Sequence, residues 1–466
     1  MRNNIVILCL DTVRKDYYER FAPRLKTRAD ISFDQCRAAS SWSVPSHGSM
    51  FTGELPSQHG IHAYNRDLSS LNRHETFLGD LPEYEAVGVS ANAYASDLFG
   101  FDGLFDDFRT ITRRMRYPDG MNVSEFGTRY SGNHRFLAYL KKSLGHTHPL
   151  QSLANGIFFK ASQVNETLPF PKLFDSGGSL VSNEVRRQAV ETSEPFVQFV
   201  NLMDAHGPLY HHLGLERKLH DAPNSWNSAS GVSTWEINKG DDIEDHETSI
   251  RYARGLYAAS IDYLDRIVSI LIDDIQDHTT NETTFIITSD HGENLVHPGD
   301  DFLFEHTGSL SEGLLHVPLD IINAPDCYGD SGARYISQLQ LGDLVTKVAN
   351  DRDYNPMKEV IAAEVVGGNH LPDDASEYWD RSIRCAYKGQ RKFVWDSLGN
   401  TTAYSLSDSP STQELVETDI SIPEWASDQF TEDIETTKRE AKESQVETNV
   451  TPGVQQRLND LGYTTS

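Results

Sequence analysis

Two acidic residues in this chain stand directly after runs of apolar, β-branched residues. Asp11 follows residues 5–10, and Asp290, with His291 beside it, follows residues 283–289. Such runs predict buried strands of a parallel sheet, and function gathers beyond the carboxyl ends of such strands. Two carboxylates and an imidazole suit a divalent cation. A strand-end Asp can equally cap a turn, so the spacing alone leaves a metal site and a structural role both open.

A serine-rich segment at residues 41–53 could supply a nucleophile. Ser43 stands two residues before Pro45, which favours extended backbone, and residues 46–48 could begin a helix. A hydroxyl just ahead of a helix N-terminus lies where backbone N–H groups receive an anion. The same pattern suits a Ser/Pro helix cap without chemistry, so both interpretations stay open at this point.

Two further histidines lie in glycine-containing segments after strand-like runs. His206 lies in the sequence MDAHGP, and His306 lies in EHTG. An imidazole can change its charge near neutral pH, but each of these residues taken singly is most often an ordinary loop histidine.

The elements that must position these residues follow an alternating pattern. Apolar runs at residues 5–10, 87–90, 196–202 and 283–288 predict strands buried on both faces, and the amphipathic stripe of residues 248–274 predicts a helix. This alternation indicates an α/β fold, with a large, mostly parallel sheet sandwiched by helices. Residues 110–190 and 211–247 are polar and weakly periodic, and we interpret them as insertions near the site.

The pattern changes after about residue 355. Residues 382–386, 392–396 and 402–406 predict short antiparallel strands joined by turns. Residues 425–450 are charged, as in a solvated helix or a loose linker, and residues 454–461 predict a last helix. We therefore expect a catalytic domain over residues 1–355, a small C-terminal α+β subdomain with an antiparallel sheet over residues 356–424, and an acidic linker with a terminal helix over residues 425–466.

The chain is strongly acidic. Its 466 residues include 41 Lys and Arg against 69 Asp and Glu, a net charge of −28. This charge argues against nucleic acid or an anionic membrane as the natural partner. Acid spread along the whole chain, with more Arg than Lys, is typical of proteins kept soluble in high salt, so we expect the source to be a halophilic archaeon. An ordinary acidic cytosolic enzyme is the alternative.

The cysteines and the apolar segments indicate a compartment. The four cysteines, at positions 9, 36, 327 and 385, form no CxxC pair, which favours free thiols in a reducing interior. The apolar run at residues 5–10 is too short for a signal sequence, and no stretch is long enough to span a membrane. We therefore expect a cytoplasmic protein without a membrane span.

Several motifs in the same order resemble those of the sulfatase family, within the alkaline-phosphatase-like superfamily, over nearly the whole chain. Residues 11–16 (DTVRKD) are similar to the family's first metal-binding turn, and residues 288–295 (TSDHGENL) to its second. Residues 41–61 (SWSVPSHGSMFTGELPSQHGI) resemble the Cys/Ser-x-Pro-Ser-Arg signature, and residues 201–210 (NLMDAHGPLY) the Asp-x-His-x-Pro-Tyr segment. Residues 305–321 (EHTGSLSEGLLHVPLDI) resemble the stretch that closes the family's core.

The resemblance implies a role for each candidate residue. Asp11, Asp290 and His291 would hold one divalent cation, and Ser43 would be the attacking group that also touches it. His206 and His306 would face the substrate, one steadying its oxygens and the other assisting the leaving group. Asn92 would supply a further oxygen contact. Arg14 and His47 would flank the nucleophile, Arg14 as a substrate contact and His47 as a catalytic residue that could act as the base for Ser43. Such a cation offsets charge on the substrate, and neighbouring donors stabilise the transition state.

The chain departs from the family pattern at two positions. Thr12 stands where the family commonly has a second acid, and His47 stands where the signature usually has Arg. In sulfatases the first signature residue is converted to formylglycine, and that Arg is part of what the maturation machinery recognises. His47 therefore argues against formylglycine at Ser43. A plain Ser43 would resemble the superfamily's phosphatases and phosphodiesterases.

We expect a metal-dependent sulfuric ester hydrolase that acts on a sulfated small molecule or glycan. One alternative is a phosphate mono- or diester hydrolase, or a phosphoryl transferase, that uses unmodified Ser43. Another is a non-catalytic protein that binds an anionic sugar. Oxygen ligands favour Ca²⁺, our first choice, or Mg²⁺, while the single histidine also admits Mn²⁺ or Zn²⁺. The sequence predicts neither the substrate nor the oligomeric state.

Overall fold

The computed structural model describes residues 2–446, apart from residues 113–115, 118, 124–125, 127–134, 167–168, 241–242, 307, 325–333, 351, 353, 370 and 372–374. Its central sheet has seven strands in the order β2-β8-β7-β1-β6-β4-β5. All neighbouring pairs from β7 to β5 are parallel, while β8 runs antiparallel to both β7 and β2. The strands are β1 (Asn4–Leu10), β2 (Ile31–Ser32), β4 (Glu85–Ser90), β5 (Asp107–Thr110), β6 (Phe196–Leu202), β7 (Thr283–Thr288) and β8 (Leu319–Ile322). The predicted mostly parallel sheet is confirmed.

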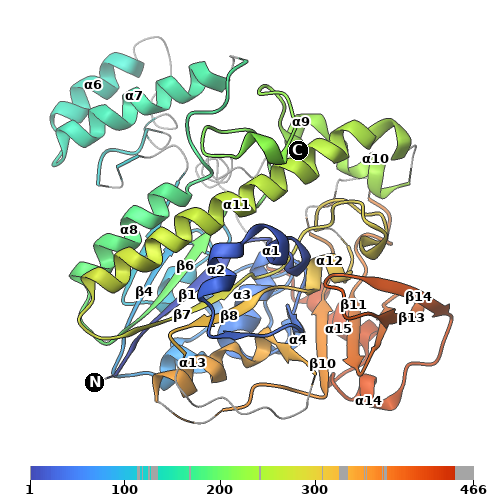
Figure 1. Ribbon diagram of the computed structural model, residues 1–466. Helices are drawn as coiled ribbons and strands as arrows, with labels where there is room; N and C mark the ends of the chain where they lie inside the picture. Colours follow the sequence, from blue (N-terminus) through green and yellow to red (C-terminus); the bar gives the residue numbers. More distant parts are fainter. Residues whose placement is uncertain are drawn as a thin grey trace.

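Helices cover both faces of this sheet, which explains the continuous apolar run of β1. Val6, Leu8 and Leu10 belong to one buried cluster, and Ile5, Ile7 and Cys9 belong to the other. The first face carries α1 (Lys15–Phe21), α2 (Pro23–Arg28), α8 (Gly178–Glu191) and α11 (Glu247–His278), and the second carries α3 (Ser43–Thr52) and α13 (Leu341–Ala349). Figure 1 shows α8 and α11 side by side along the sheet. Because both faces of such a strand are buried, its sequence does not alternate between apolar and polar residues.

Part of the region interpreted as an insertion belongs to the core. Helix α8 buries Leu180, Val181 and Val185 against the sheet, and thus connects the strands as a crossover helix. By contrast, α6 (Arg135–Leu144) and α7 (Pro149–Glu166) form a hairpin that stands away from the sheet (Figure 1). Shorter helices are α4 (Pro56–His59), α9 (Ser228–Gly231), α10 (Thr234–Asn238) and α12 (Glu312–Leu315), and β3 (Cys36–Arg37) pairs with β9 (Ile336–Ser337).

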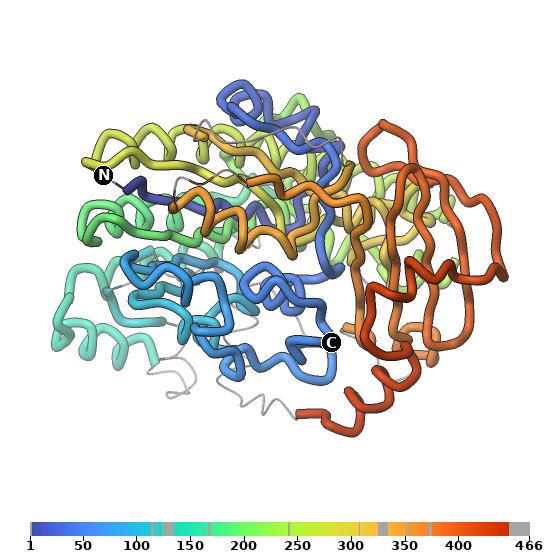
Figure 2. Tube along the Cα trace, turned by 90° about the horizontal axis from the view of Figure 1, so that it is seen from below, coloured from blue at the N-terminus to red at the C-terminus, as the bar shows by residue number. Residues whose placement is uncertain are grey.

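A second sheet lies at one end of the molecule (Figure 2). Its five antiparallel strands follow chain order: β10 (Val360–Val365), β11 (Ile383–Lys388), β12 (Arg391–Asp396), β13 (Thr401–Leu406) and β14 (Gln413–Thr418). The three strands predicted here are confirmed, and β10 and β14 are additional. Helices α14 (Glu424–Ser427) and α15 (Ile434–Glu443) follow, and α15 buries Ile434 and Ala441. The predicted last helix, at residues 454–461, lies outside the described residues, and the domain boundaries stay predictions.

A buried ionic cluster joins the two sheets. Glu312 of α12 forms ion pairs with Arg37, at 2.9 Å, and with Lys392 of β12, at 3.0 Å. The hydroxyl of Tyr387 donates to the same carboxylate over 2.7 Å. Burial alone would raise the pKa of Glu312, but the two cations hold it at about 2. The carboxylate is therefore charged and paired on both sides.

Three of the cysteines, Cys9, Cys36 and Cys385, are buried free thiols, and Cys327 lies outside the described residues. Among the residues that the structure describes, no helix has both the length and the apolar character needed to cross a membrane.

Candidate active site

The register of the central strands brings Asp11 and Asp290 together. Strand β1 pairs with β7 so that Cys9 lies opposite Thr288. Each of these residues stands two positions before an Asp, so both carboxylates emerge at the same carboxyl edge of the sheet. Asp11, Asp290 and His291 are fully buried, and each offers one ligand atom within 4.8 Å of the others.

Each of the two carboxylates has hydrogen bonds to only one of its two oxygens. Asp11 Oδ2 accepts hydrogen bonds from Asn92, at 2.6 Å, and from Asn201, at 3.0 Å. Asp290 Oδ1 accepts from the backbone N–H groups of Thr12 and His291, at 3.3 and 3.0 Å. Among the described residues, Asp11 Oδ1 and Asp290 Oδ2 have no hydrogen-bond partner although both atoms are buried. Buried anionic oxygens need a counter-charge, so these residues fit a divalent cation.

His291 is prepared as a neutral ligand. Its Nδ1 donates to the carbonyl oxygen of Gly292 over 2.8 Å, which leaves the lone pair on Nε2. Burial, with a contribution from His306, lowers the pKa of His291 to about 3. Nε2 lies 3.4 Å from Asp290 Oδ2 and 3.3 Å from the hydroxyl oxygen of Ser43. The candidate nucleophile therefore touches the candidate metal ligands.

Ser43 is the first residue of α3 and follows Trp42, which has extended backbone. The prediction of extended backbone at Ser43, with a helix from residue 46, is therefore wrong by one turn. Pro45 is tolerated because an N–H group in the first helical turn has no partner within the helix. Asn92 Nδ2 donates to the Ser43 hydroxyl over 3.0 Å as well as to Asp11. One amide thus links the nucleophile to the carboxylate.

The two loop histidines meet at this cluster. The ring of His306 lies 5.3 Å from that of His206 and 4.9 Å from that of His291, measured between centroids. Burial lowers the pKa of His206, whose Nδ1 donates to the Gly207 carbonyl over 2.6 Å. Burial opposes the charged form of His306 too, but Glu293, at 3.2 Å, raises its pKa to about 9. A neutral and a cationic imidazole therefore lie side by side.

Arg14 and His47 lie near the site but face other groups. The Arg14 guanidinium binds Asp16, Asp300 and the carbonyl oxygen of Glu293. Burial opposes its charge, but Asp16 and Asp300 raise its pKa further. Arg14 thus anchors the backbone of the residue whose carboxylate pairs with His306.

The His47 imidazole packs against the rings of Phe101 and Phe199. Its Nδ1 donates to the main-chain oxygen of Ser43 over 2.7 Å and lies 3.9 Å from Asp290 Oδ2. No described contact joins His47 or Arg14 to the Ser43 hydroxyl.

Helix α11 holds the turn that carries Asp11. Thr12 has a positive φ of 61°, which costs a β-branched residue about 1–3 kcal/mol. The Tyr257 hydroxyl donates to Thr12 O over 2.6 Å and accepts from the Arg14 N–H at 3.0 Å. Thr12 itself donates its hydroxyl to the Asp11 carbonyl and so supplies no carboxylate.

Sequence reasoning missed Asn201, Glu293 and Tyr257. Asn201 is the polar residue near the end of the apolar run of β6, and Glu293 follows Asp290-His291-Gly292 directly. Both positions lie within motifs already singled out, so a search for polar residues beside the ligands would have found them. Tyr257 lies inside a helix, 245 positions from Thr12, and nothing local in the sequence indicates its contact.

The chain thus combines the α/β fold of solved hydrolase structures with a buried candidate metal cluster at the carboxyl edge of its sheet. The chain belongs to the sulfatase family, because the Sulfatase family profile matches residues 3–341. No curated protein matches the sequence.

Solved structures share the fold at low identity. A phosphonate monoester hydrolase of Agrobacterium radiobacter superimposes with a TM-score of 0.56 at 13% identity, over 87% of this chain and 89% of that one. The phosphonate monoester hydrolase SpPMH from Silicibacter pomeroyi gives 0.57 at 12% identity, over 87% and 89%. BT4656, solved in complex with its substrate D-glucosamine-2-N,6-O-disulfate, gives 0.54 at 12% identity, over 87% and 91%.

Proposed function

We propose that this protein is a metal-dependent sulfuric ester hydrolase that cleaves the ester of a sulfated small molecule or glycan, with Ser43 as the nucleophile. The observation that carries the proposal is the position of the Ser43 hydroxyl, 3.3 Å from His291 Nε2 and 3.0 Å from Asn92 Nδ2. Membership of the sulfatase family and the sulfated sugar bound by BT4656 support the substrate class.

A divalent cation held by Asp11, Asp290 and His291 would offset charge on the substrate oxygens and make the Ser43 alkoxide easier to form. The two carboxylates favour Ca²⁺ there, with Mg²⁺ as the other hard cation, and the imidazole also admits Mn²⁺ or Zn²⁺. Asn92 donates to Ser43 and thereby aims the hydroxyl.

The Ser43 hydroxyl releases its proton to water, its oxygen bonds to the central atom of the ester, and the bond to the leaving oxygen breaks. His206 and His306 have the two remaining catalytic roles. One donates to the substrate oxygens, and the other gives a proton to the departing alcohol. A water molecule must then cleave the ester formed on Ser43, which restores the hydroxyl.

The second candidate is a phosphate or phosphonate ester hydrolase, or a phosphoryl transferase, that uses unmodified Ser43. His47 favours it, because its imidazole is buried against Phe101 and Phe199 at the signature position where sulfatases usually have Arg. Without that Arg we expect no formylglycine at Ser43. A plain serine leaves a covalent ester that water must cleave, which phosphorus tolerates better than sulfur.

One experiment separates the candidates. Purified protein is assayed on 4-nitrophenyl sulfate, 4-nitrophenyl phosphate and a phosphonate monoester, and the peptide that contains Ser43 is weighed. Oxidation to formylglycine would remove two hydrogens, about 2 Da, and would support the sulfatase. Unmodified serine with turnover on the phosphorus esters alone would establish the second candidate.

The variant Ser43→Ala should abolish turnover of the best substrate. Ser46→Ala is the matched control, because Ser46 lies on the same helix and its hydroxyl donates to the Ser40 carbonyl over 3.2 Å, away from the cluster. Full turnover by Ser43→Ala would refute the assignment of Ser43 as the nucleophile. Binding of a sulfated sugar without turnover of any ester would favour the non-catalytic alternative.

The buried free thiols of Cys9, Cys36 and Cys385 support a reducing, cytoplasmic setting for this activity.

A further inference from the structure

Helix α7 has its polar and apolar faces reversed. Its buried face carries Ser152 and Asn155, and the Asn155 amide exchanges two 2.9 Å hydrogen bonds with the backbone of Tyr117. Leu150 and Ile157, one heptad apart, are 80% and 70% exposed on the outer face. A helix of a globular protein normally turns its apolar stripe to the core, so this stripe lacks a partner.

Helix α6 repeats the arrangement. It buries Tyr139 and Ser143 and exposes Phe136, Leu137 and Leu144, each by 60% or more. Tyr139 donates its hydroxyl to the carbonyl of Ser152 on α7 over 2.7 Å, so a polar contact joins the two helices. The hairpin α6–α7 therefore presents apolar side chains from both helices to its surroundings.

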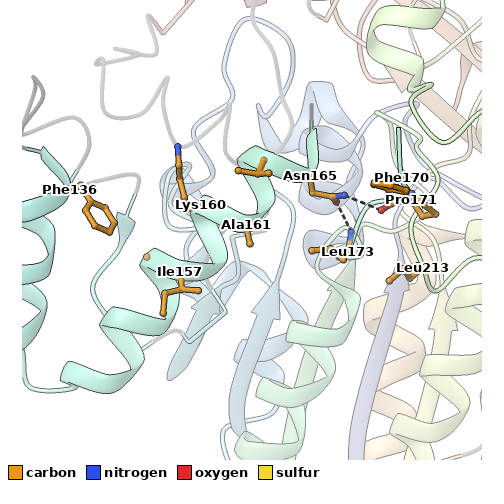
Figure 3. Close-up of a pocket in the computed structure, with 11 residues that line it drawn as sticks. Phe136, Ile157, Lys160, Ala161, Asn165, Phe170, Pro171, Leu173 and Leu213 are labelled. Carbon is orange, nitrogen blue, oxygen red and sulfur yellow. Dashed lines mark hydrogen bonds between the residues drawn. The ribbon is translucent and has the colours of Figure 1, made fainter. Parts of the chain in front are cut away.

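An apolar groove continues this surface. It has a volume of about 740 Å³ and lies between α6, α7 and the segment that follows α7. Figure 3 shows Phe136 on one side, Ile157 and Ala161 on α7, and Phe170 and Leu213 on the other side. The surface and the groove together form one contiguous apolar region, larger than the scattered exposed apolar residues of an ordinary soluble surface.

The charge of this region differs from that of the rest of the chain. Residues 126–165, which include the whole hairpin except the last residue of α7, Glu166, contain no Asp or Glu. Arg135, Lys141, Lys142 and Lys160 are exposed on the hairpin. The hairpin is thus apolar and cationic within a protein whose net charge is −28.

We propose that the hairpin α6–α7 docks on a lipid bilayer with anionic headgroups, its leucines and isoleucine entering the interface and its lysines facing the phosphates. This pattern is that of an amphipathic interfacial helix. The net charge argues against membrane contact through the surface as a whole. At 0.1 M salt, however, charges more than about 10 Å away are screened, so the charges of the projecting hairpin itself determine its attraction to the headgroups.

A second copy of the chain fits this surface less well. Hairpin against hairpin would oppose cation to cation. The other exposed large apolar residues among those described are spread over several elements, so they offer no matching apolar surface: Tyr117, Val190, Ile270, Phe302, Tyr378, Leu398, Leu415, Val416 and Val446. The proposal does not depend on the proposed catalytic function.

The test is cosedimentation of the full chain with vesicles of phosphatidylglycerol or phosphatidylcholine, at 0.15 M and 2 M KCl. We expect binding to phosphatidylglycerol at least about tenfold tighter than to phosphatidylcholine at low salt, and a smaller ratio at high salt. The double variant Leu137→Ser/Ile157→Ser should lose binding at both salt concentrations, and Lys141→Glu/Lys142→Glu should lose it mainly at low salt.

Matched controls lie outside the hairpin. Ile270→Ser/Leu398→Ser removes two exposed apolar side chains, and Lys239→Glu/Arg439→Glu makes the same change in net charge. These controls should bind as the wild type does, and all variants should keep its turnover of a soluble ester and its melting temperature. Absence of vesicle binding by the wild type, or equal losses in controls and hairpin variants, would overturn the proposal. So would a wild-type dimer that Leu137→Ser/Ile157→Ser dissociates, without any vesicle binding.

Discussion

Replacement of Asn92 by alanine should separate the positioning of the nucleophile from the positioning of the metal ligand. The Asn92 amide donates to Asp11 Oδ2 at 2.6 Å and to Ser43 Oγ at 3.0 Å. The Asn201 amide donates to the same Asp11 oxygen at 3.0 Å and, among the described contacts, makes none to Ser43. Asn201→Ala is therefore the matched control. It removes a buried amide and one bond to the same carboxylate oxygen, but leaves the bond to Ser43.

The size of the difference follows from the charge that Ser43 develops. A hydrogen bond to a charged group contributes about 1.5–3 kcal/mol, and 1.4 kcal/mol is tenfold in rate, so loss of the donor to the Ser43 alkoxide should lower kcat by about 10- to 150-fold. Loss of a bond that orients a ligating carboxylate should weaken metal binding by about 10- to 100-fold. Both variants should show the second effect, and only Asn92→Ala should show the first.

The assay measures kcat for the best ester at saturating metal, and the metal Kd by titration calorimetry. Circular dichroism and the melting temperature establish that both variants are folded. Equal kcat values for Asn92→Ala and Asn201→Ala at saturating metal would refute the reasoning, because the Ser43 contact would then contribute nothing to the chemical step.

Three further predictions concern the metal, the salt and the buried ion pairs. Chelation, and either Asp11→Asn or Asp290→Asn, should abolish turnover while the fold persists, and full activity in excess chelator from metal-free protein would contradict this. The melting temperature should rise from low to molar KCl because salt screens the repulsion among the excess acids, and a flat or falling curve would contradict it. Glu312→Gln should destabilise the protein by about 3–5 kcal/mol at pH 7, since it leaves two cations buried without their counter-charge. The folded pKa of Glu312, about 2, lies below the usual 4.5, so its contribution is complete above pH 4.5 and is lost as the pH falls toward 2. Urea unfolding from pH 7 to pH 3.5 should show the gap between wild type and variant narrow, and a constant gap would disprove the linkage.

Much of the architecture could be predicted because apolar runs determine buried strands. Residues 196–202 and 283–288 are the exact bounds of β6 and β7, and the helix predicted at residues 248–274 lies within α11. The start of α3 could not be predicted from the proline rule, because that rule describes the backbone before Pro45 and not the tolerance of the first helical turn. Strand β14 exposes most of its residues, so no apolar run marks it.

Only those residues of the candidate site that lie in local sequence motifs could be predicted. Asp11, Asp290 and His291 follow strands and were recognisable, and the structure brings them together. The directions of Arg14 and His47 depend on Asp300 and on Phe199, which are remote in sequence. The reversed faces of α7 could not be predicted for the same reason, because they depend on a contact remote in sequence. Asn155 is buried since it bonds the backbone of Tyr117, whereas an asparagine side chain by itself favours the surface.

The position of β1 at the middle of the sheet has a consequence for synthesis. Strand β1 leaves the ribosome first, but its neighbours in the sheet, β6 and β7, are residues 196–202 and 283–288. A nascent chain therefore carries the apolar strand IVILCL without any neighbour in the sheet until β6 has been made, and with one edge unpaired until β7 has been made. Such an unpaired strand is prone to aggregate. Asp290 follows β7 directly, so the two carboxylates can meet only after residue 290 of the 466 has been made. A chain truncated before β7 leaves one edge of β1 unpaired and lacks Asp290, so it cannot assemble the candidate cation site.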